Sequence, residues 1–179
     1  MDPDQPLVRR AQGGDRFAFE QLVDRHQHRL FTLAARTLGS RTDAEDAVQE
    51  ALLRAWRNIG AFRGGALFST WLYRICVNAA HDQRTRRTAD PVEPTDTEAD
   101  PRDRFADHEL SGELQQALAT LDDDQRTTVV LYDVLGSSYA EIAEITGVAE
   151  GTVKSRLFRG RAELARQLRG TPAEEDESK

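Results

Sequence analysis

The sequence has little of several residue types that mark particular classes of protein. It contains one cysteine, Cys76, among 179 residues, so an internal disulfide is excluded. With only four histidines beside it, no spacing is available for a structural zinc site. No apolar run reaches the length of a membrane span, and the first residues, MDPDQPLVRR, lack the apolar segment of a signal peptide. We therefore expect a cytoplasmic protein without membrane insertion, metal or cofactor.

Positive charge is also scarce overall, because 24 Lys and Arg stand against 31 Asp and Glu to give a net charge of −7. The charges are unevenly distributed. Residues 1–88 carry 14 Arg and 10 acidic residues, a net charge of +4, whereas residues 89–109 carry 8 acidic residues and two Arg, a net charge of −6. Local charge, rather than net charge, attracts a protein to nucleic acid. The acidic total therefore does not exclude nucleic-acid binding.

Residues 89–109 have the composition of a flexible connector. Prolines at positions 91, 94 and 101 are interspersed with acidic residues, and apolar residues are almost absent. Residues 171–179, TPAEEDESK, have the same character and are expected to be disordered. The sequence thus predicts two small domains, residues 1–88 and 110–170, joined by a flexible acidic linker.

The periodicity of apolar residues predicts an all-α fold. Residues 17–38 follow helical spacing, and this helix is expected to end at Gly39. A second helix is expected to begin at a capping box formed by Thr42 and Glu45. After a glycine-containing loop, Ser69 is expected to cap a third helix.

Residues 138–162 have the pattern of a helix-turn-helix. Ser138 and Glu141 form a capping box at the start of its first helix, and Gly147 ends that helix. The second helix, from about Glu150, is expected to bury one apolar stripe, made of Val153, Leu157, Leu164 and Leu168. Another face carries hydroxyl and arginine side chains suited to a major groove, namely Thr152, Ser155, Arg156 and Arg159. An amphipathic surface helix would explain the apolar stripe alone, whereas the combination favours DNA binding.

A loop and the third helix combine apolar, aromatic and basic side chains in a way that suits single-stranded DNA. Aromatic and apolar walls accept unstacked bases, and arginine neutralises phosphates. The loop residues are Phe62, Arg63, Gly64, Gly65, Ala66, Leu67 and Phe68, and the helix residues are Trp71, Arg74, Asn78, His81, Arg84, Arg86 and Arg87. For Trp71 by itself, a core position is the slightly better interpretation.

The second helix has an unusual polar face, made of Asp46, Gln49, Glu50 and Leu53. A solvated surface is the usual interpretation of such a face. Leu53 among acidic residues also allows a protein partner.

Three segments, in this order, resemble the bacterial RNA polymerase sigma factors of the extracytoplasmic-function (ECF) group, which retain only the second and fourth sigma regions. The segments are DAEDAVQEALLRAWRNI, FRGGALFSTWLYRICVNAA and SYAEIAEITGVAEGTVKSRLFRGR. The resemblance implies a protein that binds core RNA polymerase, directs initiation at specific promoters and is controlled by an anti-sigma factor.

The resemblance also implies a role for each segment. The first would dock Asp46, Gln49, Glu50 and Leu53 on the clamp helices of the β′ subunit. The second would open and read the minus-ten element, with an extruded base held by the loop near Asn78. The third would read the duplex minus-thirty-five element while its domain sits on the β flap, and its DNA-facing residues would be Thr152, Lys154, Ser155, Arg156, Phe158 and Arg159.

Two other functions remain as alternatives. A conventional helix-turn-helix regulator would need a receiver or ligand domain, and residues 1–88 show no alternation of strands and helices. An enzyme acting on DNA would use Asp43, Glu45, Asp46 and Glu50 as metal ligands. Acidic residues at the start of a helix already have an explanation in the helix dipole.

Overall fold

The computed structural model describes residues 2–89 and 112–169, so the tail 171–179 and nearly all of the expected linker lie outside the described residues. The first half contains α1 (Gln5–Gln12), α2 (Arg16–Leu38), α3 (Arg41–Asn58), the 3-10 turn η1 (Ile59–Ala61) and α4 (Phe68–Ala89). The second half contains α6 (Gly112–Ala119), α7 (Asp123–Val129), the π-helical turn η3 (Val130–Val134), α8 (Tyr139–Thr146) and α9 (Glu150–Arg169). The described ranges contain no strand, and the all-α prediction is confirmed. None of their helices combines the length and apolarity needed to cross a bilayer.

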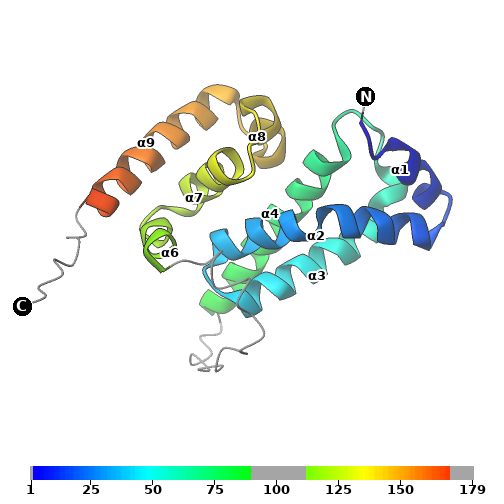
Figure 1. The fold of residues 1–179 in the computed structure, drawn as a ribbon, viewed down its shortest axis with the longest axis horizontal. Coiled ribbons are helices and arrows are strands. Elements are labelled where there is room, and N and C mark those ends of the chain that lie inside the picture. The colour runs from blue at the N-terminus through cyan, green and yellow to red at the C-terminus, as the bar shows by residue number, and fades with distance from the viewer. Residues whose placement is uncertain (1, 90–111, 170–179) are drawn as a thin grey trace, which may run out of the picture.

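Helices α2, α3 and α4 pack against one another, and α1 lies beside the N-terminal end of α2 (Figure 1). The face of α3 that points into this bundle is a stripe of buried alanines, Ala44, Ala47, Ala51 and Ala55. Because alanine has no side chain beyond Cβ, α2 and α4 can approach α3 closely. Leu22 and Leu30 of α2 and Leu72 of α4 fill the remaining space.

The junction between α2 and α3 agrees with the sequence prediction at one residue and differs at another. Gly39 ends α2 in the left-handed conformation, with φ of 70°, as expected. The cap of α3 is Ser40, whose hydroxyl accepts the backbone N–H of Asp43. The prediction that Thr42 caps this helix is therefore wrong, because Ser40 already satisfies the first free N–H groups.

The start of α4 also differs from the prediction. The helix begins at Phe68, so Ser69 lies inside its first turn and is not the cap. The Phe68 N–H donates instead to the Asp2 carboxylate, 2.7 Å away. The first N–H groups of a helix lack intrahelical partners, and a carboxylate there satisfies one of them and complements the helix dipole. The acceptor comes from 66 positions earlier in the chain, a distance that local spacing cannot reveal.

Helices α8 and α9 form the helix-turn-helix that the sequence predicts. Ser138 and Glu141 make a reciprocal capping box at the start of α8, and Gly147 ends α8 with φ of 72°. In α9, Val153 and Leu157 are buried as expected. Leu168 is 47% exposed, so its assignment to the buried stripe is wrong. It lies one turn beyond the last residue of the stripe that packs on the core.

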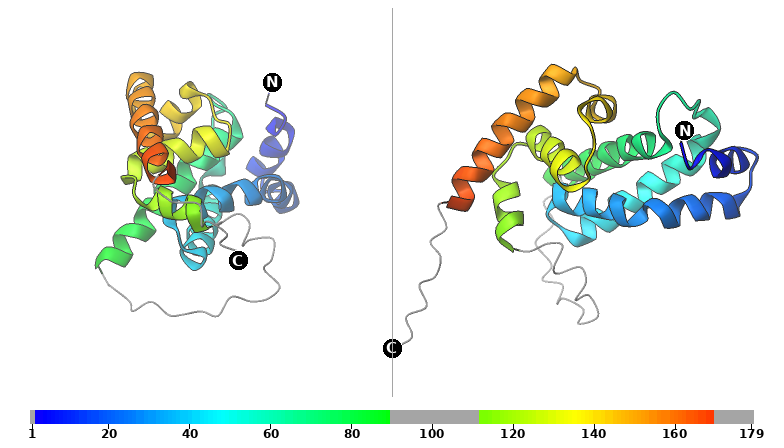
Figure 2. Two further views of the ribbon diagram at one scale, coloured as in Figure 1. Left: turned by 60° about the vertical axis from the view of Figure 1, so that its left-hand side comes forward. Right: turned by 45° about the horizontal axis from the view of Figure 1, so that its top comes forward.

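The two halves pack together, with α8 against α4 and α7 against α2 (Figure 2). Arg126 on α7 joins three chain segments. Its guanidinium donates to the carbonyl oxygen of Thr37 at the end of α2, at 2.9 Å, and to those of Leu118 and Leu121 around the end of α6, both at 2.7 Å. Burial lowers the pKa of Arg126. The carbonyl groups at helix C-termini offset the cost of burying this positive charge, because they form the negative end of the helix dipole.

The single thiol, Cys76, is part of the core of the first half. It lies on α4, fully buried, with Sγ 3.7 Å from the carbonyl oxygen of Leu30. Burial raises the pKa of the Cys76 thiol to about 12, so the reactive thiolate is rare at neutral pH. Cys76 therefore contributes to packing rather than to redox chemistry.

We predict that two glycines of α9 respond oppositely to replacement by alanine. A Cβ at Gly160 would lie 2.8 Å from Cγ2 of Val129 on α7, whereas a Cβ at Gly151 meets nothing within 4 Å. Gly160→Ala should therefore lower the free energy of unfolding by about 1 to 3 kcal/mol through overpacking. Gly151→Ala should leave it unchanged or raise it by up to about 1 kcal/mol. Urea unfolding of both variants checks this, and equal stabilities would contradict the close contact between α7 and α9.

Candidate nucleic-acid interface

The outer face of α9 is well exposed. Ser155 and Arg159 lie one turn apart on this face, and the partly buried Thr152 and Arg156 lie beside them. Lys154 and Phe158 project from a neighbouring side of the helix, and Phe158 is 76% exposed. The apolar stripe of α9 is turned toward α7, so the hydroxyl and arginine side chains remain accessible for a partner.

Arg156 is held by an ion pair within the second half. Its guanidinium binds the carboxylate of Asp124 in the first turn of α7. A hollow beside this pair is lined by residues from the start of α7 and from α9, the recognition helix of the helix-turn-helix. They are Asp122, Asp123, Asp124, Gln125, Thr152, Arg156 and Arg159. A carboxylate of the same chain thus binds the guanidinium of Arg156, which is the type of group that also binds phosphate.

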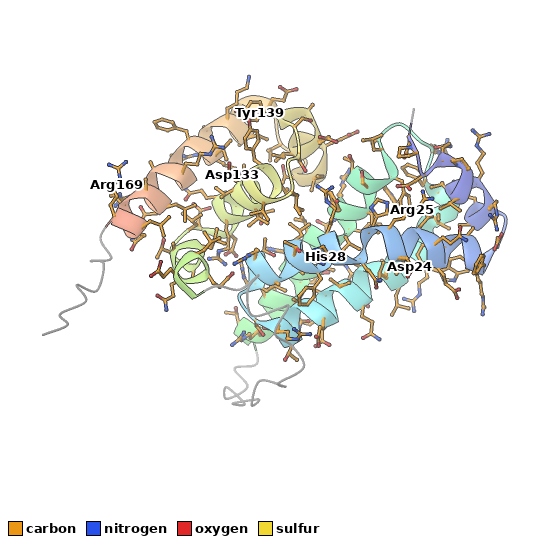
Figure 3. The ribbon with its side chains drawn as sticks, viewed as in Figure 1. Asp24, Arg25, His28, Asp133, Tyr139 and Arg169 are labelled. Carbon is orange, nitrogen blue, oxygen red and sulfur yellow. The ribbon has the colours of Figure 1, made fainter. Side chains whose placement is uncertain are left out.

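Two tyrosines lie where η3 leads into α8, and the sequence analysis did not identify them. The rings of Tyr132 and Tyr139 stack with centroids 5.0 Å apart, and a hydrogen bond to Tyr139 raises the pKa of Tyr132. Lys154 lies over Tyr139, and Arg161 lies over Tyr132 while binding Asp133. Tyr139 and Asp133 are labelled in Figure 3. These contacts tie α9 to η3 and α8, so they fix how the recognition helix is presented.

In the first half, the two phenylalanines at the ends of the expected DNA-binding loop are buried. Phe62 is 7% exposed and Phe68 is 1% exposed. Both rings pack on Trp71, with centroids 5.2 and 5.6 Å from its ring. We therefore exclude Phe62 and Phe68 from direct DNA contact, since their aromatic faces are used for packing. The exposed part of the loop runs from Arg63 to Leu67.

A pocket lies beside this loop, on the accessible side of α4. It has a volume of about 340 Å³, and its lining comes from α3, η1 and α4, namely Arg54, Asn58, Ala61, Trp71, Ile75 and Asn78. Trp71 is partly buried, so its ring both packs on the core and forms a wall of the pocket. Both interpretations of Trp71 therefore describe part of its environment. An aromatic wall, an amide and a nearby arginine suit an unstacked base.

The basic residues expected along α4 do not form one cluster. Arg74, Asn78 and His81 lie on one exposed face, as the sequence predicts. Arg84 binds Asp123 of the second half and the carbonyl oxygen of Thr37. The three C-terminal arginines diverge because successive positions of a helix point in different directions.

The other two arginines at the end of α4 face α3. Arg87 binds Asp43, with a nitrogen-to-oxygen distance of 2.7 Å. Arg86 lines a groove between α3 and α4. The expected grouping of Arg84, Arg86 and Arg87 for phosphate contact is therefore not present in this arrangement.

The groove between α3 and α4 brings the expected protein-binding residues together. It has a volume of about 180 Å³ and includes Asp46, Gln49, Glu50 and Leu53. Leu53 is 44% exposed, and Glu50 binds Arg54 at 2.7 Å. The acidic residues do not converge as metal ligands would, because Asp43 binds Arg87 and Glu45 binds Arg41.

Comparisons with known proteins identify the family of this chain. A model described as Sigma-70 region 2 matches residues 22–89, and one described as Sigma-70, region 4 matches residues 111–164. The chain is 46% identical over 165 residues to the ECF RNA polymerase sigma factor SigM of Mycobacterium tuberculosis strain H37Rv, covering 92% of this chain and 84% of SigM. The chain belongs to the ECF sigma factors. SigW of Bacillus subtilis is 38% identical and aligns with 90% of this sigma factor and 95% of SigW.

Solved structures agree with this assignment. The structure of CnrH in complex with the cytosolic domain of CnrY superposes with a TM-score of 0.72 and 32% identity, covering 94% of this chain and 98% of CnrH. The sigma factor RpoE of Bartonella quintana, in complex with the anti-sigma factor NepR, gives a TM-score of 0.69 and 27% identity, covering 85% of this chain and 97% of RpoE.

The function of the chain follows from the family. This sigma factor binds core RNA polymerase and directs promoter-specific initiation of transcription. The family is a class of transcription initiation factors. Because the first half matches sigma region 2, the alternative of a conventional regulator with a receiver or ligand domain is not favoured.

The ion pair between Arg156 and Asp124 gives a testable prediction for DNA binding. Asp124→Ala should raise affinity for duplex DNA of random sequence roughly threefold, because it removes a negative charge that competes with phosphate. It should also reduce the preference for the minus-thirty-five element, since the lost negative charge strengthens phosphate contacts to any sequence. Fluorescence anisotropy with both duplexes at one salt concentration measures the two effects.

The matched control is Glu113→Ala on α6, which makes the same charge change at another exposed residue of the second half. If both variants changed affinity and preference equally, the ion pair would have no specific role in DNA binding.

Proposed function

We propose that the two sigma regions divide the work of initiation between the two halves of this chain. Residues 1–88 would act as region 2, which binds core polymerase and reads and melts the minus-ten element. Residues 110–170 would act as region 4, which reads the minus-thirty-five element and sits on the β flap. The family matches at residues 22–89 and 111–164 support this division, with residues 89–109 as the connector.

The polymerase-binding surface is the groove between α3 and α4. Asp46, Gln49 and Leu53 are exposed there, and Glu50 is partly exposed. An exposed leucine with acidic neighbours fits a protein partner that offers an apolar contact and basic side chains. The proposed partner is the clamp-helix region of the β′ subunit.

The minus-ten element is read by the exposed loop from Arg63 to Leu67 and by the pocket beside Trp71. A base extruded from the duplex loses its stacking, which costs a few kcal/mol. Trp71 would restore part of this energy as an aromatic wall, and the exposed Asn78 would donate or accept hydrogen bonds at the base edge. Arg74 and His81 extend this face for phosphate contacts.

The minus-thirty-five element is read as a duplex by α9. Thr152, Ser155, Arg156 and Arg159 form the group that faces the major groove, with Lys154 and Phe158 at its side. When α9 binds the element, Arg156 releases Asp124 and contacts DNA instead.

The two halves would separate when the sigma factor binds polymerase and DNA. In the packed arrangement, Asn78 and His81 line a cavity of about 180 Å³ between the halves, which Asp123 and Asp124 border from the other side. These acidic residues oppose the entry of DNA phosphates. Separation breaks the ion pair between Arg84 and Asp123 and frees Arg84 for the backbone of the promoter.

An anti-sigma factor is the proposed regulator of this activity. CnrH and RpoE, which share the fold of this chain, were solved in complex with the cytosolic domain of CnrY and with the anti-sigma factor NepR. We also propose that the sigma factor acts in the cytoplasm, on RNA polymerase, and that it catalyses no reaction of its own.

Charge reversal tests the polymerase-binding surface. Asp46→Arg together with Glu50→Arg should weaken binding to core RNA polymerase by more than tenfold, because juxtaposed like charges at an interface cost several kcal/mol. Glu20→Arg with Asp24→Arg is the matched control, since these exposed acids of α2 have the same spacing of four residues (Asp24 is labelled in Figure 3). Circular dichroism first checks that both double variants keep the native helix content. Titration of labelled protein with core enzyme then measures binding, and equal affinities of the two double variants would reject the proposed polymerase-binding surface.

Mutations in the two DNA-binding surfaces should impair different steps of promoter recognition. Arg156→Ala should reduce binding to the minus-thirty-five duplex by about 1 to 3 kcal/mol if it contacts a base edge. Asn78→Ala should leave that binding intact and impair strand opening and the base preference at the minus-ten element, since opening needs a pocket for an unstacked base. Permanganate footprinting of the holoenzyme measures opening. Normal melting by Asn78→Ala on several promoters would refute the pocket.

A further inference from the structure

Helix α1 holds one end of the loop that precedes α4. Gln12, in the last turn of α1, donates from Nε2 to the carbonyl oxygen of Ile59, at 3.1 Å, and to that of Phe62, at 2.7 Å. These carbonyl groups belong to the first residue of η1 and to the residue where the loop begins. One amide group therefore fixes the point at which the chain leaves the 3-10 turn.

The other end of the loop is held by Asp2. One carboxylate oxygen accepts the N–H of Phe68, the first residue of α4, at 2.7 Å. The second oxygen accepts the N–H of Asp4 at 2.9 Å, which fixes the orientation of the carboxylate. The loop is thus bracketed by two side chains that lie ten positions apart in the sequence, one before α1 and one at its C-terminal end.

The segment that makes these contacts is itself anchored to the core. Asp4 is 4% exposed, and its two carboxylate oxygens bind His26 Nε2 at 2.6 Å and Arg25 Nη1 at 2.9 Å. Both partners lie on α2, and the His26 ring packs 5.6 Å from that of Phe68. Leu7 and Val8 of α1 are also buried. The bracket is therefore anchored to the helical bundle through α2.

Only the middle of the loop remains exposed, from Arg63 to Leu67. Gly64 within it has φ of 72°, which favours glycine, and an added Cβ there would lie 3.9 Å from the side-chain oxygen of Gln5 on α1. The loop therefore has fixed ends and an accessible centre that also lies close to α1. Such a loop loses less conformational freedom when it encloses a base.

We propose that α1 and Asp2 are a positioning element for promoter reading, in which Gln12 and Asp2 set the shape of the loop that selects the minus-ten base. This inference rests on the proposed role of the loop in minus-ten recognition. The element lies before residue 22, where the match to sigma region 2 begins. Gln12 and Asp2 act through the loop backbone and contact no DNA themselves.

The experiment compares full-length variants bound to core polymerase. Gln12→Leu removes the donor for both carbonyl groups, and Asp2→Ala removes the acceptor for Phe68. The rescue variants are Gln12→Lys, which again supplies a donor, and Asp2→Asn, which keeps an acceptor oxygen. Gln27→Leu, at an exposed residue of α2, is the control for loss of a surface amide. Single-stranded oligonucleotides that vary at each minus-ten position measure affinity and base preference, and hydrogen exchange measures the order of residues 62–68.

Gln12→Leu and Asp2→Ala should each weaken binding to the preferred oligonucleotide by about fivefold to tenfold. They should also reduce discrimination between bases and speed exchange in the loop. The rescue variants should restore the preference, and duplex minus-thirty-five binding should be unchanged throughout. Unchanged base preference in both variants, or unchanged loop exchange, would overturn the positioning role.

Asn78→Ala, measured in the same assay, separates this inference from the function on which it rests. If Asn78→Ala impairs minus-ten binding while the Gln12 and Asp2 variants do not, only the positioning role fails. If Asn78→Ala and the positioning variants all bind the oligonucleotides normally, the proposed pocket fails and the positioning role fails with it.

Discussion

The guanidinium of Arg126 ties the two halves of the chain together. It bridges the C-terminal end of α2 and the end of α6, two sites where backbone carbonyl groups lack intrahelical partners. A buried guanidinium is costly unless its donors are satisfied, and here main-chain oxygens satisfy them. Because these acceptors belong to the backbone, the geometry is set by where the helices end. The ends of α2 and α6 are therefore as important to the architecture as their apolar faces.

This arrangement determines how the recognition surfaces are presented. The recognition helix α9 is packed on α7 through the close contact at Gly160, and its Lys154 and Arg161 lie over the tyrosine stack between η3 and α8. Its arginine-bearing face is oriented outward but is balanced by the acidic start of α7. On the first half, Asn78 and His81 face the same acidic residues across the cavity between the halves. Each proposed DNA-binding surface thus lies near a carboxylate of its own chain. This favours partners whose phosphate groups can compete with that carboxylate for the basic side chains.

The first half shows how a small helical bundle supports a precise loop. Aromatic packing among Phe62, Phe68 and Trp71 holds the loop ends from inside. From outside, Gln12 donates to the carbonyl oxygen of Phe62, and Asp2 accepts the N–H of Phe68. The exposed centre is then short enough to keep its shape while it remains accessible. A flexible loop could enclose a base as well, but ordering it would consume part of the binding energy.

The sequence by itself indicated the three long helices of the first half, the helix-turn-helix and the family of this protein. The capping box at Ser138, the helix-ending Gly39 and the exposed Leu53 were all predicted correctly, because each depends on residues three or four positions apart on one helix. The three ordered segments were enough to indicate an ECF sigma factor, and the relatives confirm it.

Only the tertiary structure decided which side chains remain available to a partner. Phe62 and Phe68 are buried, Arg84 and Arg87 bind Asp123 and Asp43, and α4 begins at a carboxylate supplied by Asp2. Each of these features depends on residues far apart in the chain. Periodicity reports the faces of one helix, whereas the choice between packing and recognition depends on which other helix lies against that face.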